Sequence, residues 1–260
     1  MELPKEYSEP KEMDKLEGFN MILFGPPKVG KTSFAADWPD SLIIECEPNG
    51  ADHIRCKKVD VSSMDELRQV YQLVRQDTTF KTVVIDSLDK VSSWIEQEIC
   101  KELGTTSIME SKKGERNGVQ WGMYKERVLA FVLGTIKLGK NVIFISHTKK
   151  AETDGNGSII NPKSINLYGS TASEVLALVN NIGYMMAKEV EGGKVKHFVS
   201  FKAGQAVEAG SRNASLRDKV IEIPLGKGYE AIEQCFKKPA PAAPKVLPVK
   251  PASKSAKEDK

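Results

Sequence analysis

The sequence contains no apolar run long enough to cross a membrane, for which about 20 consecutive apolar residues are needed. Its first residues are charged and lack the apolar core of a secretory signal peptide. Only four cysteines are present, none of them in a C-x-x-C pair, and we interpret Cys46 and Cys56 as free thiols rather than as metal ligands with His53. These absences predict a cytoplasmic protein with no membrane partner.

A strong excess of either charge is also missing. The formal net charge is +3 over 260 residues, and it comes from the segment 237–260, which holds seven lysines and two acidic residues. The other 236 residues carry a net charge of −2, so a surface for nucleic acid would have to be local. We predict a flexible amino-terminal arm over 1–17, one domain over 18–236, and a disordered tail rich in Pro, Ala and Lys over 237–260.

The segment 25–32 matches the pattern G-x-x-x-x-G-K-[ST], which is typical of a phosphate-binding P-loop. Glycines let such a loop curl so that its N–H groups point at phosphate oxygens, and the following helix adds its positive end. The lysine reaches the β- and γ-phosphates, and the Thr32 hydroxyl can ligate Mg²⁺. The pattern therefore predicts ATP and Mg²⁺ as cofactors. The predicted nucleotide contacts are Gly25, Pro26, Pro27, Lys28, Val29, Gly30, Lys31, Thr32 and Ser33.

The surrounding residues fit the strand–loop–helix context that this motif requires. The apolar run 20–24 predicts a buried strand, and 33–38 suits a helix that Pro39 ends. Further strands are expected at 41–47, 82–86 and 141–146, alternating with helices at 64–76, 91–103 and 120–138. The segments 181–187 and 196–201 predict a hairpin. We therefore predict an α/β fold with a mostly parallel sheet, helices on both faces and a C-terminal β-hairpin.

Three of the predicted strands end in residues that can carry chemistry. The third strand ends in Asp86, a Walker B pattern whose carboxylate would hold Mg²⁺ together with Thr32. Glu45 and Glu47 close the second strand, and His147 follows the fourth. Because ligands bind beyond the carboxyl ends of parallel strands, we expect these side chains to converge near the P-loop.

The order of these segments resembles that of RecA-type ATPases, and most of all that of small phage-encoded RecA-like proteins, the Sak-type single-strand annealing ATPases. The matching segments are 25–32, 43–47, 83–87 and 142–147, and the resemblance covers about residues 18–236. It implies an ATPase that binds single-stranded DNA in phage-type recombination, by annealing or strand pairing, in the cytoplasm of the host cell. The implied partners are single-stranded DNA, further copies of the chain in a ring or filament, and a single-strand-binding protein.

The resemblance also implies roles for the residues at the strand ends. Glu47 would orient the attacking water as general base, and we prefer it to Glu45, which lies on the same face, because it is further toward the end of the strand. Lys31 would act on the γ-phosphate as a catalytic residue. His147 stands where relatives carry a polar γ-phosphate sensor, usually glutamine; a structural role is the alternative.

Two long polar segments, 104–118 and 149–167, lie where RecA-like proteins carry their DNA-binding loops. Trp121 and Tyr124 supply rings that could stack on bases. The alternative is that the loops are solvated and that both rings belong to the core. The candidate DNA-binding cations are Lys112, Lys113, Arg116, Lys149, Lys150 and Lys163.

RecA-like assemblies also lend cations to the γ-phosphate of a neighbouring subunit. Lys196, Lys202 and Arg212 lie in the C-terminal part of the domain, where the resemblance would place such trans-acting residues. Ordinary surface positions are the alternative for these three side chains.

Three other classes of protein also use a P-loop. A small-molecule kinase needs an arginine-rich lid, which this sequence lacks, and a GTPase needs an Asp-x-x-Gly motif that the segment 86–89 does not provide. A nucleotide-switched assembly or helicase-loading ATPase with little turnover remains the alternative, and Glu47 argues against it. Stimulation of hydrolysis by single-stranded DNA distinguishes these classes.

Overall fold

A computed structural model describes residues 16–110, 118–154 and 159–237 of the chain. Three of the predicted DNA-binding cations, Lys112, Lys113 and Arg116, lie outside these residues, as do most of the predicted amino-terminal arm and tail. Among the described residues, no helix is long and apolar enough to cross a membrane.

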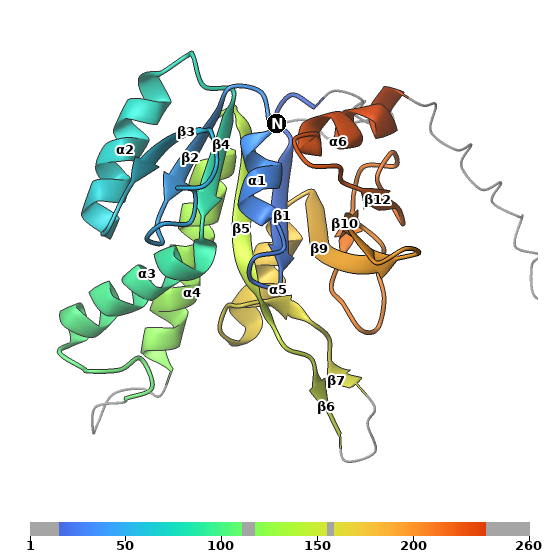
Figure 1. Ribbon diagram of the computed structural model, residues 1–260. Coiled ribbons are helices and arrows are strands. Elements are labelled where there is room, and N and C mark those ends of the chain that lie inside the picture. Colours follow the sequence, from blue (N-terminus) through green and yellow to red (C-terminus); the bar gives the residue numbers. More distant parts are fainter. Residues whose placement is uncertain (1–15, 111–117, 155–158, 238–260) are drawn as a thin grey trace, which may run out of the picture.

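The described residues form a ten-stranded sheet flanked by helices, and a separate two-stranded ribbon (Figure 1). The helices are α1 Lys31–Ala36, α2 Met64–Gln76, α3 Leu88–Leu103, α4 Val119–Ile136, α5 Gly169–Leu178 and α6 Gly228–Lys237. The strands of the parallel part are β1 Asn20–Gly25, β2 Ser41–Glu45, β3 Lys57–Asp60, β4 Thr82–Asp86, β5 Asn141–Lys149 and β9 Asn181–Val190. The others are β6 Glu152–Thr153, β7 Ile159–Asn161, β8 Ser164–Ile165, β10 Lys194–Ser200, β11 Gly210–Ser211 and β12 Val220–Glu222.

The strand order is β12-β10-β9-β1-β5-β4-β2-β3, with β11 paired to β9 and β8 to β5. Strand β1 lies between β9 and β5 and runs parallel to both, and β5 separates β1 from β4. Strand β1, which precedes the P-loop, and strand β4, which ends in Asp86, are therefore not neighbours. The predicted α/β class is confirmed, and so is the C-terminal hairpin, formed by the antiparallel pair β9 and β10.

Alternation along the strands supplies two hydrophobic cores, one on each face of the sheet. Ile22 and Phe24 of β1 belong to the core covered by α2, α3, α4 and α5. Met21 and Leu23 belong to the other core, which α1 and α6 cover. Because both faces of β1 are buried, its sequence reads as a continuous apolar run rather than an alternating one.

Several elements differ from the sequence prediction; strand β2, for example, ends at Glu45 and not at residue 47. Strand β3 was not predicted because its sequence, KKVD, has a single apolar residue, as is common for an edge strand protected by charge. Helix α1 spans Lys31–Ala36, so it begins inside the P-loop motif, two residues earlier than predicted. Strand β5 continues to Lys149, which was predicted to lie in a loop.

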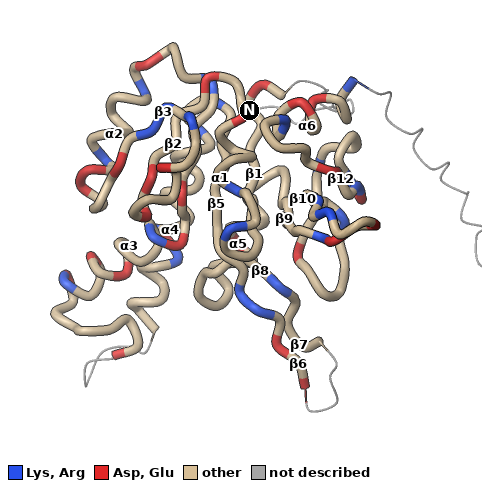
Figure 2. Tube along the Cα trace, in the orientation of Figure 1, with Lys and Arg blue, Asp and Glu red and all other residues tan. Residues whose placement is uncertain are grey.

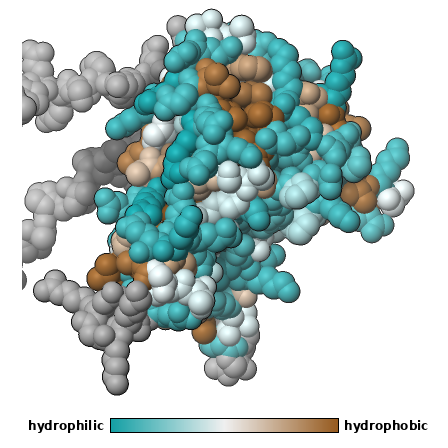
Figure 3. All heavy atoms as spheres, turned by 90° about the vertical axis from the view of Figure 1, so that its left-hand side faces the viewer, coloured by the Kyte–Doolittle hydropathy of each residue, from teal (hydrophilic) through white to brown (hydrophobic). Residues whose placement is uncertain are grey.

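Figure 3 views the molecule from the side of α2 and α3, where the surface is mostly hydrophilic with separate hydrophobic patches. Exposed apolar side chains such as Leu73 of α2 and Met109 beyond α3 contribute to such patches. Scattered exposed apolar residues are normal on a protein surface, so they identify no binding face.

Candidate active site

The loop between β1 and α1 has the close packing that its glycines permit. A side chain at Gly25 would place its Cβ 2.4 Å from the carbonyl oxygen of Met185 on β9, so only glycine fits there. Gly30 has a φ of 98°, in the region that favours glycine. The two glycines of the motif are therefore required by the local backbone, independently of any ligand.

The ammonium group of Lys31 folds back over this loop. Its Nζ donates to the carbonyl oxygens of Gly25, at 3.0 Å, and Pro26, at 2.9 Å. Burial lowers the pKa of Lys31, and the negative charge of Asp86 acts in the opposite direction. The cation is thus already held where the pattern predicts the phosphates.

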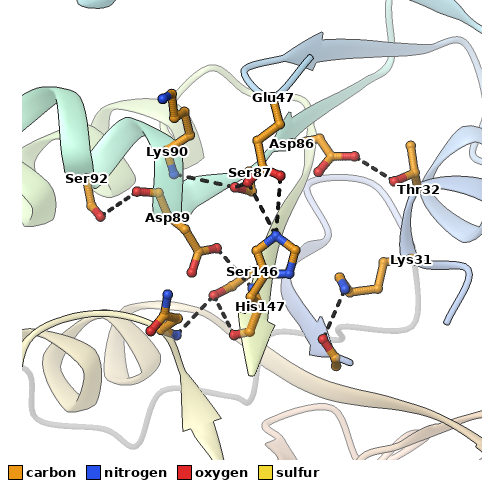
Figure 4. A network of polar contacts seen from close by, with 12 residues as sticks. Lys31, Thr32, Glu47, Asp86, Ser87, Asp89, Lys90, Ser92, Ser146 and His147 are labelled. Atoms are coloured by element: carbon orange, nitrogen blue, oxygen red, sulfur yellow. Dashed lines mark hydrogen bonds and ion pairs between the residues drawn. The ribbon is translucent and has the colours of Figure 1, made fainter. Parts of the chain in front are cut away.

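Thr32 and Asp86 meet although they come from different elements. The Thr32 hydroxyl donates to Oδ2 of Asp86 at 2.7 Å (Figure 4). Burial raises the pKa of Asp86, and the hydroxyl of Thr32 opposes that effect. A hydroxyl and a carboxylate suit Mg²⁺, which takes most of its ligands from phosphates and water. Among the described residues, no group of three or more His, Cys, Asp or Glu side chains is arranged so that it could hold a metal ion.

Glu47 lies just beyond the end of β2 and contacts two other elements. The Ser87 hydroxyl donates to its Oε1, and Nε2 of His147 lies 3.3 Å from the carboxylate (Figure 4). The hydrogen bond to His147 is the main cause that lowers the pKa of Glu47, and the same bond raises the pKa of His147. Glu47 is therefore held as a carboxylate near the P-loop, with its oxygens occupied by protein donors.

Glu45 has a different environment from Glu47. Its side chain is 2% exposed and forms an ion pair with Lys58 at 2.6 Å. It also accepts the backbone N–H of Ala51 at 2.9 Å, while Lys58 contacts Asp52 and Asp60 as well. These contacts fix Glu45 in a buried ion pair, which supports the choice of Glu47 for any role with water.

His147 lies at the carboxyl end of the parallel part of β5, and β5 continues for two residues beyond it. It is the last β5 residue paired with β1, opposite Gly25. Its backbone N–H donates to Oδ2 of Asp89 at 3.0 Å, so the first turn of α3 holds this point of β5. The expected convergence of strand ends is present, and Asp89 is a member that the motif analysis left without a role.

A cleft of about 410 Å³ lies beside the P-loop, and most of its wall was not predicted. Ser33 and Phe34 of α1 line one side, and His197 of β10 lies on the other. Nδ1 of His197 is 2.9 Å from the carbonyl oxygen of Val29, so Nδ1 carries the proton that this carbonyl accepts. No sequence pattern indicated His197, because only the fold of the hairpin brings it to the motif.

The described candidates for DNA contact lie together at the base of the β6–β7 hairpin. Figure 2 shows basic residues at this base and acidic residues nearer the tip. Lys149 lies 3.4 Å from Glu152, and Lys163 lies over the ring of Tyr184 at 5.8 Å. Lys150 is exposed. The three lysines therefore form a small basic patch, although two of them have protein partners.

Of the two rings for which base stacking and core packing were the alternatives, Tyr124 is buried and Trp121 is partly buried. Tyr124 is 1% exposed, and Trp121 and Tyr168 pack against it. The ring of Tyr124 belongs to the core, so the core alternative is correct for this residue. Tyr168, which was not considered, is 40% exposed.

The three trans-acting candidates differ in how they are engaged. Arg212 donates to the carbonyl oxygen of Ala177, at 2.5 Å, and to Oδ1 of Asn180, at 3.2 Å, near the end of α5. Lys196 pairs with Glu222 at 2.9 Å. Lys202 is exposed and forms no ion pair with the described residues.

The chain matches a family model in sequence and is similar in structure to solved proteins. The family model described as AAA domain matches residues 17–213. No curated protein matches the chain in sequence. The structure is similar to that of the KaiC-like protein PH0186 from the hyperthermophilic archaeon Pyrococcus horikoshii OT3, at 16% identity and a TM-score of 0.47, over 82% of this chain and 88% of that chain. A likeness of this size says nothing about function.

Proposed function

The chain belongs to the AAA domain family, and from that premise we propose that this RecA-like P-loop ATPase binds Mg·ATP, hydrolyses it, and is stimulated by single-stranded DNA. The observation that carries the proposal is the contact of the Thr32 hydroxyl with Asp86, at 2.7 Å, beside the buried ammonium of Lys31. A hydroxyl, a carboxylate and a lysine at one loop are the donors that a metal-bound triphosphate requires.

The residues of the site would have separate roles in binding the nucleotide and its metal ion. Lys31 would exchange its bonds to Gly25 and Pro26 for phosphate oxygens, a change from neutral to charged acceptors that strengthens its hydrogen bonds. Thr32 and Asp86 would hold Mg²⁺, which supplies charge neutralisation at the phosphates. Ser33 and the cleft that contains His197 would receive the nucleoside part of the ligand.

Glu47 would orient the attacking water. Because its pKa is lowered, it is present as a carboxylate at neutral pH and accepts a hydrogen bond well, although it is a weak proton acceptor. The contacts with Ser87 and His147 occupy its oxygens. Hydrolysis therefore requires one of these contacts to give way to water, which makes His147 a suitable reporter of nucleotide state.

Single-stranded DNA is proposed as the partner because of where the basic patch lies. Lys149 ends the strand that carries His147, Lys150 follows it, and Lys163 precedes β8, which pairs with that strand at the base of the β6–β7 hairpin (Figure 2). A strand bound there would contact β5 within a few residues of the active site. We extend the proposal to phage-type recombination by annealing or strand pairing, in a ring or filament, with a single-strand-binding protein as a further partner, on the resemblance described above.

One observation favours a second candidate, a nucleotide-switched assembly or helicase-loading ATPase. The engagement of Glu47 by Ser87 and His147 is the arrangement expected of a protein that binds nucleotide and hydrolyses it slowly. In that case single-stranded DNA would leave the rate unchanged.

The test is ATP binding and steady-state hydrolysis by the full chain, with and without a mixed-sequence single-stranded oligonucleotide. Lys31→Ala removes a charge-assisted contact and is expected to weaken Mg·ATP binding by about 1.5–3 kcal/mol. Lys81→Ala, which removes an exposed ion pair with Asp40, is the control and should bind as the parent does. Unchanged binding by Lys31→Ala would refute the P-loop assignment, and hydrolysis that does not respond to DNA would favour the second candidate.

A further inference from the structure

A second cleft, of about 390 Å³, lies on the other side of the strand that carries His147. Helix α3 supplies Asp89 and Glu96 to its wall, α4 supplies Tyr124, and the end of β5 supplies Lys149. Asn166 and Tyr168, just before α5, complete it. The cleft thus adjoins the basic patch and shares Asp89 with the active site.

Two buried polar atoms in this wall lack a hydrogen-bond partner among the described residues. They are the hydroxyl of Tyr124 and Oδ1 of Asp89. Ser92 and the backbone of Tyr168 lie near the Tyr124 hydroxyl, and Ser146 lies near the Asp89 carboxylate, but the two unpartnered atoms form no hydrogen bond of normal geometry with them. Buried polar groups are nearly always paired, so two such atoms at one cleft indicate a ligand that offers complementary groups.

The chemistry of the wall selects the ligand. Asp89 and Glu96 outnumber Lys149, so a phosphate would be repelled from the interior. The free carboxylate oxygen can only accept a hydrogen bond, and the phenol can donate or accept one. Tyr168, 40% exposed and held edge-on by Tyr124, offers a ring for stacking. An aromatic heterocycle with an amino group can donate to the carboxylate, hydrogen-bond with the phenol and stack on the ring of Tyr168. Lys149 can form an ionic contact with a phosphate attached to that heterocycle.

The cleft is also connected to the residues proposed to act in hydrolysis. Asp89 lines the cleft, and its Oδ2 accepts the backbone N–H of His147 at 3.0 Å (Figure 4). The backbone N–H of Asn166 donates to the hydroxyl of Ser146 at 3.2 Å. Both walls of the cleft therefore hold β5 at or next to His147, whose imidazole contacts Glu47.

We propose that this cleft receives one base of the bound single strand, with Asp89 and Tyr124 reading its amino and ring-nitrogen edge and Tyr168 stacking on its face. This inference rests on the proposed DNA binding and extends it in two ways. It makes the interaction selective for bases with an exocyclic amine, so cytosine, adenine and guanine are preferred to thymine. It also gives the strand a route to Glu47 through Asp89 and His147.

The experiment measures binding of fluorescent oligonucleotides to the full chain by anisotropy, together with stimulation of ATP hydrolysis. The probes are oligo-dC, oligo-dA, oligo-dT and an abasic backbone of equal length. We expect dC and dA to bind more tightly than dT, and the abasic strand to bind at least about fivefold more weakly, since stacking is lost.

Two variants and one control test the residues of the cleft. Tyr124→Phe removes only the unpartnered hydroxyl, so it should keep or raise the melting temperature while reducing affinity for dC and dA by about fivefold. Tyr168→Leu should weaken binding of every base-bearing strand and leave the abasic strand unaffected. Tyr229→Phe, in α6 on the opposite face of the sheet, should match the parent in every assay.

The outcomes separate this inference from the function on which it rests. If the parent binds base-bearing and abasic strands equally, or if both variants match the parent, the cleft receives no base and DNA binding stands on the lysines alone. If the parent binds none of the oligonucleotides, the proposed function fails and the cleft assignment fails with it.

Discussion

At the scale of single residues, the site depends on which of two similar carboxylates is free to act. Glu45 and Glu47 are two positions apart, but the first is fixed by Lys58 and Ala51, whereas the second contacts Ser87 and His147 near the P-loop. The difference in contacts predicts opposite effects of the same substitution at the two positions.

Glu47→Gln should bind Mg·ATP as the parent does and lose hydrolysis by about 10²–10⁴-fold, because the amide orients water poorly while the phosphate contacts remain. Glu45→Gln should retain most of the activity of the folded protein. It should reduce the free energy of unfolding by about 1–3 kcal/mol, because the ion pair with Lys58 is replaced by a contact with a neutral amide. Single-turnover hydrolysis and chemical denaturation measure the two effects. The reverse pattern would assign the base to Glu45.

The contact between His147 and Glu47 also predicts a pH dependence. The raised pKa of His147 gives stability that is complete below the unfolded-state pKa of about 6.5 and is lost as the pH rises through the folded value. The lowered pKa of Glu47 gives stability that is complete above about 4.3 and is lost as the pH falls through the folded value. The pair should therefore stabilise the protein most between about pH 4.3 and 6.5.

An NMR titration of the imidazole measures this effect directly. In the parent, the midpoint of His147 should lie above that of a free histidine, and Glu47→Gln should shift it down. Both side chains are about one-third exposed, at 36% and 37%, so solvent screening will keep the effect on melting temperature small. A midpoint that ignores Glu47→Gln would mean that the two side chains do not interact in solution.

At the scale of elements, β5 has two different environments along its length. As far as His147 it pairs in parallel with β1, and beyond that Thr148 and Lys149 pair antiparallel with β8. A single strand thus carries the residue next to Glu47 and the base of the β6–β7 hairpin. If single-stranded DNA bound at the base of this hairpin and displaced it, the displacement would act on the same β5 backbone that positions His147.

The basic patch predicts how DNA binding depends on salt. Each phosphate neutralised on a single strand contributes about −0.7 to the slope of log K against log salt. Replacing Lys149, Lys150 and Lys163 by Ala should therefore make the slope less steep by up to about 2. Anisotropy over a salt series measures it, with a chain ending at Phe236 as the comparison. If loss of the tail abolishes binding and the triple variant keeps the parental slope, the hairpin base is not the DNA site.

At the scale of the whole molecule, the proposed assembly depends on a cation reaching a neighbouring active site. Arg212 is hydrogen-bonded at the end of α5, and Lys196 pairs with Glu222, which leaves Lys202 as the candidate that forms no ion pair with the described residues. Substitution of Arg212 would disturb α5 whether or not the residue acts in trans, so it cannot serve as the test.

Mixing Lys202→Ala subunits with Glu47→Gln subunits tests action in trans. If Lys202 serves a neighbour, a mixed interface pairs an intact Glu47 with an intact Lys202, and hydrolysis should rise above that of either variant alone. A mixture of Lys188→Ala and Glu47→Gln subunits, with a lysine from the tip of the β9–β10 hairpin, is the control. No rise at any mixing ratio would assign Lys202 to the solvent-exposed surface.

The sequence by itself determined the features that depend on local spacing. The P-loop pattern, the buried strands around it and the carboxylate at the end of β4 are each encoded within a few consecutive residues, so the α/β class, the hairpin, and the approach of Thr32 to Asp86 could be predicted. Strand β3 could not, because its sequence KKVD has no apolar pattern and it pairs only at an edge.

Only the tertiary structure decided which polar groups meet across the sheet. The strand ends predicted that Glu47 and His147 would lie near the P-loop, but only the structure shows that these side chains, 100 positions apart, contact each other. His197 is 168 positions from Val29, and no local pattern relates these two residues. The sequence also placed Tyr124 on an apolar helix face without showing that its hydroxyl reaches a polar cleft beside Asp89. Such contacts arise when packing fixes the relative positions of whole elements, because the strength of a polar contact depends on distances of a few ångströms that the order of residues does not specify.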